Sequence, residues 1–217
     1  SIDPLWEKYY EWTPYQYAAC NPLSFSDGNG WDVIIAFSGA NFFGTDDKAT
    51  AGRIVENINS FALSNNISDI NAIAYPTQAF PEDFFTEDAI DYIKSNKKEN
   101  EKLIIYGYSI GGIAAKKLCD KLDEMDITVE LLITVDIAYG NASLMINREI
   151  PDNVEFNINF YQTNPSKILS RGDENSAAEK KKTAIKNIHK EKTNHSNIDE
   201  RTQGQAEAEI KATIKYE

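Results

Sequence analysis

One turn between an apolar run and a small-residue run constrains this chain more than any other feature. Residues 103–106 form a continuous apolar stretch, of the kind that a strand buried in a parallel sheet requires. The sequence GYSIG follows at residues 107–111, and residues 112–120 are rich in small side chains with helical spacing of the apolar ones. The pattern predicts a strand, a tight turn and a helix, with Ser109 held above an edge of the sheet.

Strand and helix patterns alternate along the rest of the chain. Apolar runs predict further strands at residues 31–37, 70–75 and 129–135, and alternating apolar residues predict another at 154–161. Amphipathic spacing predicts helices at 49–64, from 86 to the solvated run at 97, from the turn to about 125, and at 198–214. Residues 185–191 fit a strand or a helix, and we favour a strand. This rhythm is typical of an α/β domain with a mostly parallel central sheet and helices on both faces.

Three local details accompany these elements. A sharp loop is expected at Ser38–Asn41, Pro76 is expected to stop the strand at 70–75, and Thr86 is expected to cap the helix that follows.

Composition narrows the class of protein. The 217 residues, 41% of them hydrophobic, suffice for one sizeable domain. A net charge of −12 would repel phosphates, which argues against a nucleic-acid partner. Cys20 and Cys119 are too few and too far apart to imply a disulfide framework. No run of eighteen apolar residues and no basic-then-apolar leader occurs, so we expect a soluble piece.

The turn at Ser109 needs a base, because a serine hydroxyl is a weak nucleophile at neutral pH. The chain has two histidines. His195 lies in a polar, turn-like stretch before the C-terminal helix pattern, and loops at strand ends commonly carry such bases. His189 lies in a segment that reads as the surface of a strand or helix. We therefore favour His195 as the base over His189.

A third group must orient the base. Asp136 ends the apolar strand at 129–135, and a carboxylate there is costly unless it is paired, for instance with an imidazole N–H. Asp173 and Asp152 remain alternatives. The backbone amides of Ala40 and Ile110 are candidates for stabilising an oxyanion. This chemistry requires neither a metal nor an organic cofactor.

These motifs resemble the α/β-hydrolases of the lipase and esterase kind, over about residues 31–217. GYSIGG resembles that family's nucleophile turn, FSGAN the strand and loop that supply an oxyanion donor, and VDIA the strand end that carries the acid. The resemblance implies that Ser109, Asp136 and His195 are nucleophile, acid and base, with oxyanion amides from Ala40 and Ile110. VDIA lacks the proline often found after that aspartate, and the strand before His195 is poorly marked.

Residues 1–30 resemble the C-terminal end of the rearrangement-hotspot (RHS) repeat core. The matching residues are Asp3, Pro4, Leu5, Tyr9, Tyr10, Thr13, Pro14, Tyr15, Tyr17, Asn21, Pro22 and Asp27. The departures are Cys20, where an asparagine is usual, and Gly28, where a proline is usual. The resemblance implies that 31–217 is a variable effector domain, commonly a toxin, secreted or delivered into a target cell as part of a larger bacterial protein and made with a matching immunity protein. From the residues alone, the alternative for 1–30 is an aromatic-rich arm that packs on the domain.

A basic segment at residues 166–192 holds eight basic and four acidic side chains in an otherwise acidic chain. It fits either a patch or lid that meets anionic lipid headgroups at a membrane surface, or a plain solvated face. Taken together, the sequence predicts a serine hydrolase of carboxylic esters, of the lipase or phospholipase type. A thioesterase or peptidase with the same triad is the alternative enzyme, and a catalytically silent domain that binds a partner is the alternative from another class.

Overall fold

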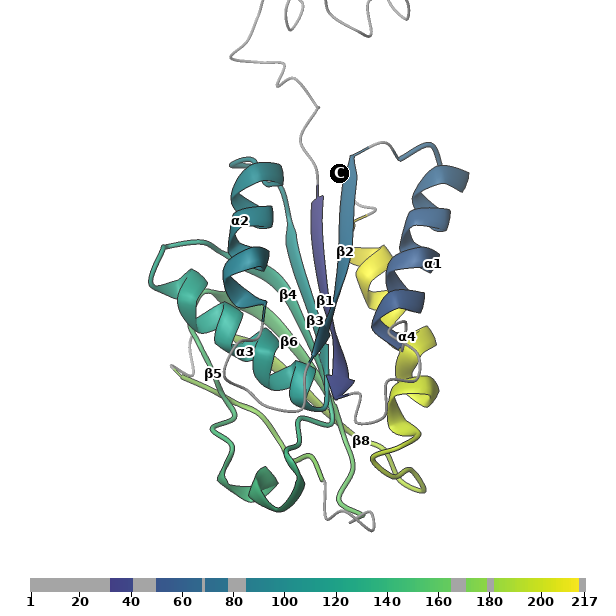
Figure 1. Cartoon of the computed structure of the whole chain (residues 1–217), viewed down its shortest axis with the longest axis vertical. Coiled ribbons are helices and arrows are strands. Elements are labelled where there is room, and N and C mark those ends of the chain that lie inside the picture. Colours follow the sequence, from purple (N-terminus) through teal and green to yellow (C-terminus); the bar gives the residue numbers. More distant parts are fainter. Residues whose placement is uncertain are drawn as a thin grey trace, which may run out of the picture. The chain divides into compact units, whose positions relative to one another are not determined.

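A sheet of six parallel strands forms the centre of the computed structural model, which describes residues 32–40, 50–67, 69–77, 85–164, 171–178 and 182–214. The strands are β1 (Asp32–Ala40), β2 (Ile70–Thr77), β3 (Leu103–Tyr108), β4 (Val129–Val135), β6 (Val154–Tyr161) and β8 (Ala184–His189). Their spatial order is β2-β1-β3-β4-β6-β8, and every neighbouring pair is parallel. All the carboxyl ends therefore meet at one edge, the lower end of the sheet in Figure 1.

Helices cover both faces of this sheet. Helices α1 (Thr50–Ser64) and α4 (Ile198–Ile214) pack on one face, whereas α2 (Thr86–Asn96) and α3 (Ile110–Asp123) pack on the other, as Figure 1 shows. The prediction of an α/β architecture with a mostly parallel central sheet is confirmed.

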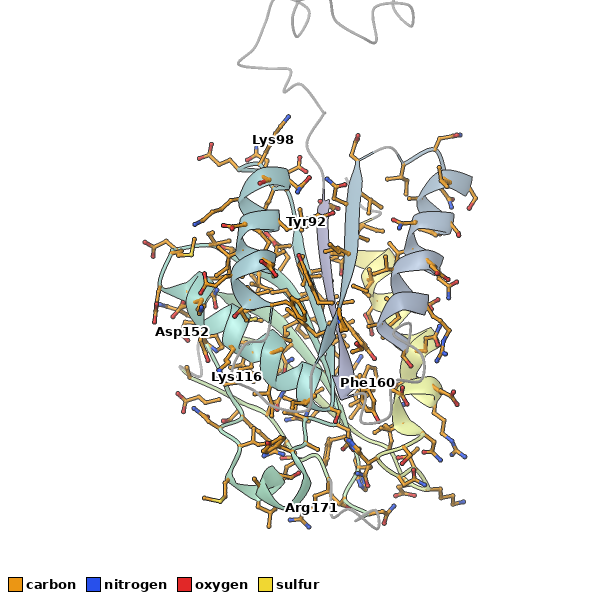
Figure 2. All side chains as sticks on the ribbon, viewed as in Figure 1. Tyr92, Lys98, Lys116, Asp152, Phe160 and Arg171 are labelled. Carbon is orange, nitrogen blue, oxygen red and sulfur yellow. The ribbon has the colours of Figure 1, made fainter. Side chains whose placement is uncertain are left out.

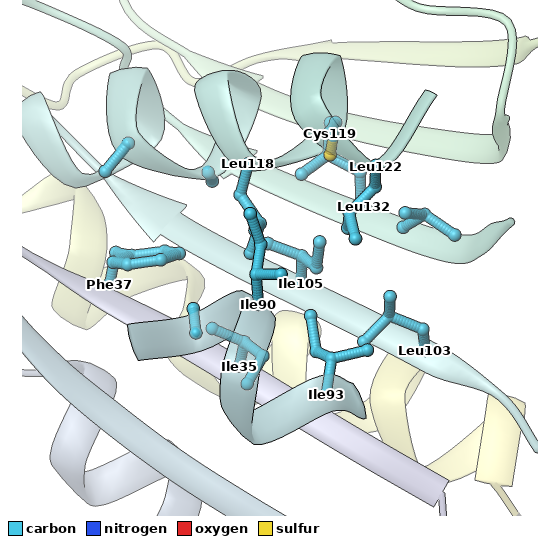
Figure 3. Packing of buried hydrophobic residues seen from close by; sticks show 14 of the residues in the cluster. Ile35, Phe37, Ile90, Ile93, Leu103, Ile105, Leu118, Cys119, Leu122 and Leu132 are labelled. Carbon is cyan, nitrogen blue, oxygen red and sulfur yellow. The ribbon is translucent and has the colours of Figure 1, made fainter. Parts of the chain in front are cut away.

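Alternate residues of each strand point into two separate cores. In β1, Ile34 belongs to the core under α1 and α4, and its neighbours Val33 and Ile35 belong to the core under α2 and α3. Because both faces of a central strand are buried, the sequence of such a strand is apolar throughout rather than alternating. Figure 3 shows the second core, where Ile90 of α2 and Leu118 of α3 meet over the sheet.

Cys119 lies in the same core and is a free, buried thiol. Burial raises the pKa of this thiol, so it remains protonated and packs as a small apolar side chain. Cys20 lies outside the described residues.

Beyond α3, an irregular layer covers the same face of β4, β6 and β8. It contains η4 (Gly140–Met145) and a two-stranded parallel sheet of β5 (Glu149–Ile150) and β7 (Ser176–Ala177). The buried Asn175 holds this layer, because its Nδ2 donates to Thr134 Oγ1 at 2.9 Å and to Asn157 Oδ1 at 3.0 Å. Amide hydrogen bonds thus dock residues 171–178 on the sheet. Arg171 marks this carboxyl edge in Figure 2, opposite Lys98.

The observed boundaries correct three details. Strand β2 continues through Pro76 to Thr77, because β2 is an edge strand and the N–H that proline lacks is not needed on its outer side. Strand β1 runs to Ala40, with a shift in register after Phe37, where a sharp loop was expected. Thr86 is the first residue of α2, and Phe85 occupies the N-cap position without a side-chain cap.

Other predictions gain support or fall outside the described ranges. The strand favoured at 185–191 is confirmed as β8. The RHS-like segment 1–30 and much of the basic segment, including residues 165–170 and 179–181, lie outside the described residues. Within the part of the chain that the structure describes, the helices are too short or too polar to cross a bilayer.

Candidate active site

Ser109 occupies the strained turn between β3 and α3. Its φ of 57° and ψ of −123° lie in a region that residues other than glycine rarely adopt. The neighbouring positions have room only for glycine. A Cβ on Gly111 would lie 2.3 Å from the Ser38 carbonyl oxygen, and one on Gly107 would lie 2.4 Å from the Gly111 carbonyl oxygen. The packing therefore holds the serine in one conformation at the sheet edge.

A continuous chain of hydrogen bonds joins three side chains at this edge. Ser109 Oγ lies 2.8 Å from His195 Nε2, and His195 Nδ1 lies 2.7 Å from Asp136 Oδ2. An ionised carboxylate can only accept, so Nδ1 carries the proton toward Asp136. Nε2 of the neutral imidazole is then the acceptor for the hydroxyl proton of Ser109. The arrangement can withdraw a proton from the serine oxygen.

The carboxylate of Asp136 is fully buried and saturated with donors. Oδ1 accepts from the backbone N–H of Gln162 at 3.1 Å and of Gly172 at 2.7 Å. Oδ2 accepts from Gln162 Nε2 at 2.8 Å as well as from His195. A buried anion needs such donors, because it has no contact with solvent. The four donors therefore hold the carboxylate in one orientation.

Tyr108 holds the base from the strand side. Its hydroxyl donates to the backbone carbonyl of His195, and the two rings lie 5.4 Å apart at a tilt of 30°. Burial raises the pKa of Tyr108 well above its ordinary value, and the charges of Asp199 and Asp136 act in the same direction. The hydroxyl thus remains a donor throughout the physiological range. The sequence analysis did not identify this residue, although its place directly before Ser109 is a signal of proximity to the site.

The alternative candidates take no part in this chain of hydrogen bonds. His189 is exposed on β8 and contacts Thr163 Oγ1 at 3.2 Å. Asp173 is exposed, and Asp152 forms an ion pair with Lys182 at 3.9 Å. The structure thus brings together Ser109 with the histidine and the aspartate that the sequence analysis favoured.

Both predicted oxyanion donors belong to segments beside the serine. Ile110 begins α3, and the first N–H groups of a helix have no acceptors within the helix. Ala40 ends β1 directly after Gly39, where a Cβ would lie 3.4 Å from Ser109 Cβ and 2.8 Å from the ring of Tyr108. The end of β1 therefore packs against the turn, and the role of the two amides stays a prediction.

Exposed apolar side chains lie in η4, the segment that follows Asp136 in the chain. Segment η4 starts four residues after Asp136, and within it Leu144 is 66% exposed and Met145 is 87% exposed. The guanidinium of Arg148 fixes this segment by donating to the backbone carbonyls of Ile137, Ser143 and Ile146. Leu144 and Met145 are therefore exposed to solvent on a segment whose backbone is held by hydrogen bonds from Arg148.

Comparison with known proteins assigns no relative. No model of a known protein family matches the chain, and no curated protein matches it significantly.

Among the described residues, no group of three or more His, Cys, Asp or Glu side chains is arranged to hold a metal ion.

Proposed function

We propose that this chain is a serine hydrolase of carboxylic esters, with Ser109 as nucleophile, His195 as general base and Asp136 as the group that orients the base. One observation carries the proposal: the hydrogen-bond chain from Ser109 Oγ through both imidazole nitrogens to a buried carboxylate. That geometry is the one that serine acyl transfer requires.

In the proposed reaction, Ser109 Oγ attacks the acyl carbonyl while His195 Nε2 takes its proton. The amides of Ile110 and Ala40 stabilise the tetrahedral oxyanion. The imidazolium then protonates the leaving alkoxide, and the acyl group remains on Ser109. A water molecule gives a proton to His195 and attacks the acyl-enzyme, which releases the carboxylic acid and restores the serine.

The topology supports an α/β-hydrolase-like fold for this proposal. The strand order reverses between β1 and β3, and sites in open parallel sheets gather at such a reversal, outside the carboxyl ends of the strands. Ser109 follows β3 directly. The order of nucleophile, acid and base along the chain is also that of the α/β-hydrolases.

A lipid is the substrate that we propose, in preference to a small ester. The exposed Leu144 and Met145 support it, because they follow Asp136 within ten residues and exposed apolar side chains favour contact with acyl chains or an interface. The resemblance of residues 1–30 to the end of an RHS core supports a further proposal, in which the domain is a delivered effector that is neutralised by a matching immunity protein.

Fluorophosphonate labelling tests the triad directly. We expect labelling of the wild type and of the control variants Ser60→Ala and His189→Ala, and none of Ser109→Ala or His195→Ala. Release of fatty acid from mixed phospholipid vesicles then tests the lipid proposal. Labelling without release would redirect the search to small esters, thioesters or peptides, whereas absence of labelling in the wild type would favour a silent binding domain.

A further inference from the structure

We infer that Gln162 is a positioning residue that sets the basicity of His195 through Asp136. The inference rests on the proposed function and deepens it. Gln162 directly follows β6 and is fully buried. Its backbone N–H donates to Asp136 Oδ1 at 3.1 Å, and its side-chain Nε2 donates to Asp136 Oδ2 at 2.8 Å. One residue thus holds both oxygens of the carboxylate.

The side-chain contact matters most, because Oδ2 is also the oxygen that His195 Nδ1 meets at 2.7 Å. A carboxylate oxygen that accepts a second strong hydrogen bond has less charge to offer the first donor. Gln162 therefore reduces the stabilisation that Asp136 gives to a protonated imidazole. The imidazolium then returns its proton to a leaving group more readily. The amide also fixes the carboxylate plane, so that Oδ2 stays aligned with Nδ1.

A substitution of the side chain isolates this effect. The backbone donors of Gly172 and of residue 162 itself remain on Oδ1 in every variant. The hydroxyl of Tyr108 remains on the His195 carbonyl oxygen. The substitution alters none of the other ionisable groups near this site. Among the described residues these are Tyr108, Arg148, Arg171, Asp173 and Asp199.

The test is a titration of His195 in Gln162→Met, which keeps the bulk of the side chain and removes its donor. The chain contains two histidines, so proton NMR of the imidazoles resolves them, and the exposed His189 serves as the internal reference. We expect the pKa of His195 to rise by about one unit and that of His189 to stay unchanged. The acid limb of fluorophosphonate labelling should move to higher pH by the same amount, and on that limb, at a pH well below the pKa, labelling should fall about tenfold.

Asn153→Leu is the matched control, because it removes a side-chain amide donor at the opposite end of β6 from Gln162. Asn153 directly precedes β6, and its Nδ2 donates to the backbone carbonyl oxygens of Cys119 at 3.1 Å and Ile127 at 2.9 Å. This variant should lose stability and keep the wild-type pKa of His195. A shift of the same size in Asn153→Leu would show that Gln162 acts only through general packing, and would overturn the inference.

Two further outcomes are separable. If wild-type protein reacts with no fluorophosphonate, the proposed function fails, whereas the NMR titration still decides whether Gln162 tunes His195. If Gln162→Met does not fold, Gln162→Leu also removes the donor with a side chain of different shape, and it should raise the pKa of His195 as well. An unchanged titration in the folded variant refutes the assigned role.

Discussion

Replacing Gly172 by alanine should disable the site while leaving the fold in place. The backbone N–H of Gly172 donates to Asp136 Oδ1 at 2.7 Å, so the residue lies directly against the carboxylate. A Cβ on Gly172 would be 2.3 Å from the same oxygen and 3.1 Å from both Asp136 Cα and Tyr161 Cβ. The oxygen is not free to retreat, because the amide of Gln162 and the imidazole of His195 hold the rest of the carboxylate.

The size of the effect follows from this overlap. An ordinary contact begins at 3.4 Å, so the carboxylate and the segment that carries residue 172 must separate by about 1 Å. A displacement of about 1 Å in a catalytic arrangement can reduce the rate about 100-fold, equivalent to about 2.7 kcal/mol in the activation free energy. Overpacking of a buried site costs about 1–3 kcal/mol of folding stability, which a domain of ordinary stability survives.

The assay compares Gly172→Ala with Gly204→Ala. Gly204 lies within α4, and a Cβ there would meet no atom within 4 Å. The control should therefore gain about 0.5–1 kcal/mol of stability, raise Tm by about 2–4 °C and label with fluorophosphonate at the wild-type rate. Gly172→Ala should give a cooperative thermal transition at a lower Tm, with labelling reduced about 100-fold. Labelling of folded Gly172→Ala at the wild-type rate would refute the claim that the position of Asp136 controls the serine.

Three other perturbations follow from the same structure. Tyr108→Phe keeps the ring beside the base and removes its hydroxyl, so labelling should fall about tenfold with little loss of stability. An unchanged labelling rate would mean that the hydroxyl does not position the base. Replacing Leu144 and Met145 together by serine should reduce fatty-acid release from vesicles severalfold and leave hydrolysis of a soluble ester unchanged. Equal losses on both substrates would contradict a role of these side chains in contact with the lipid interface. Burial raises the pKa of Tyr75 from 10.0 to about 12 and that of Tyr106 further, so the stability that their neutral forms provide is fully present below pH 10 and is lost as the pH rises toward 12. Urea unfolding between pH 9 and pH 12, followed together with tyrosinate absorbance, should show that these two tyrosines ionise only as the protein unfolds. Ionisation of all tyrosines near pH 10 in protein that stays folded would contradict the prediction.

The sequence predicted the parallel core well, because a strand buried on both faces leaves a continuous apolar run. Strand β4 begins and ends where the apolar run at 129–135 does, and β6 coincides with the alternating pattern at 154–161. The same logic located Asp136, since a carboxylate at the end of an apolar strand has to find partners. Pro76 misled the prediction, because the periodicity of a strand does not reveal whether it lies at an edge of the sheet.

The irregular layer was not predictable from periodicity. Hydrogen bonds of the Asn175 side chain dock residues 171–178, and such contacts leave no spacing pattern in a sequence. Gly172 belongs to this segment, so its contact with Asp136 was equally hidden. Gln162 was different: it follows an apolar strand that ends at the same edge as Asp136, and the reasoning applied to the aspartate could have found it.

Register explains why residues so far apart in the sequence meet at one point. Tyr108 and Val135 are paired across β3 and β4, so the next residues, Ser109 and Asp136, leave the two strands side by side. Ser109 and Asp136 have positive φ angles of 57° and 47°, respectively. Residues other than glycine adopt such angles only with conformational strain. Hydrogen bonds to the sheet hold each in place: Ser109 N–H donates to the Val135 carbonyl oxygen at 2.9 Å, and Asp136 N–H donates to that of Phe160 at 2.7 Å.

The two strained residues make opposite demands on their surroundings. In the proposed mechanism the serine must keep a lone pair free for attack, and within the described residues its hydroxyl forms its hydrogen bond with the imidazole. The aspartate must keep its charge without water, so four donors surround it. His195 spans the two environments and comes from a third part of the chain, anchored by the Tyr108 hydroxyl. The parallel sheet therefore brings the proposed nucleophile and acid together, whereas Gln162 at the end of β6 and Gly172 in the irregular layer supply hydrogen-bond donors to the acid.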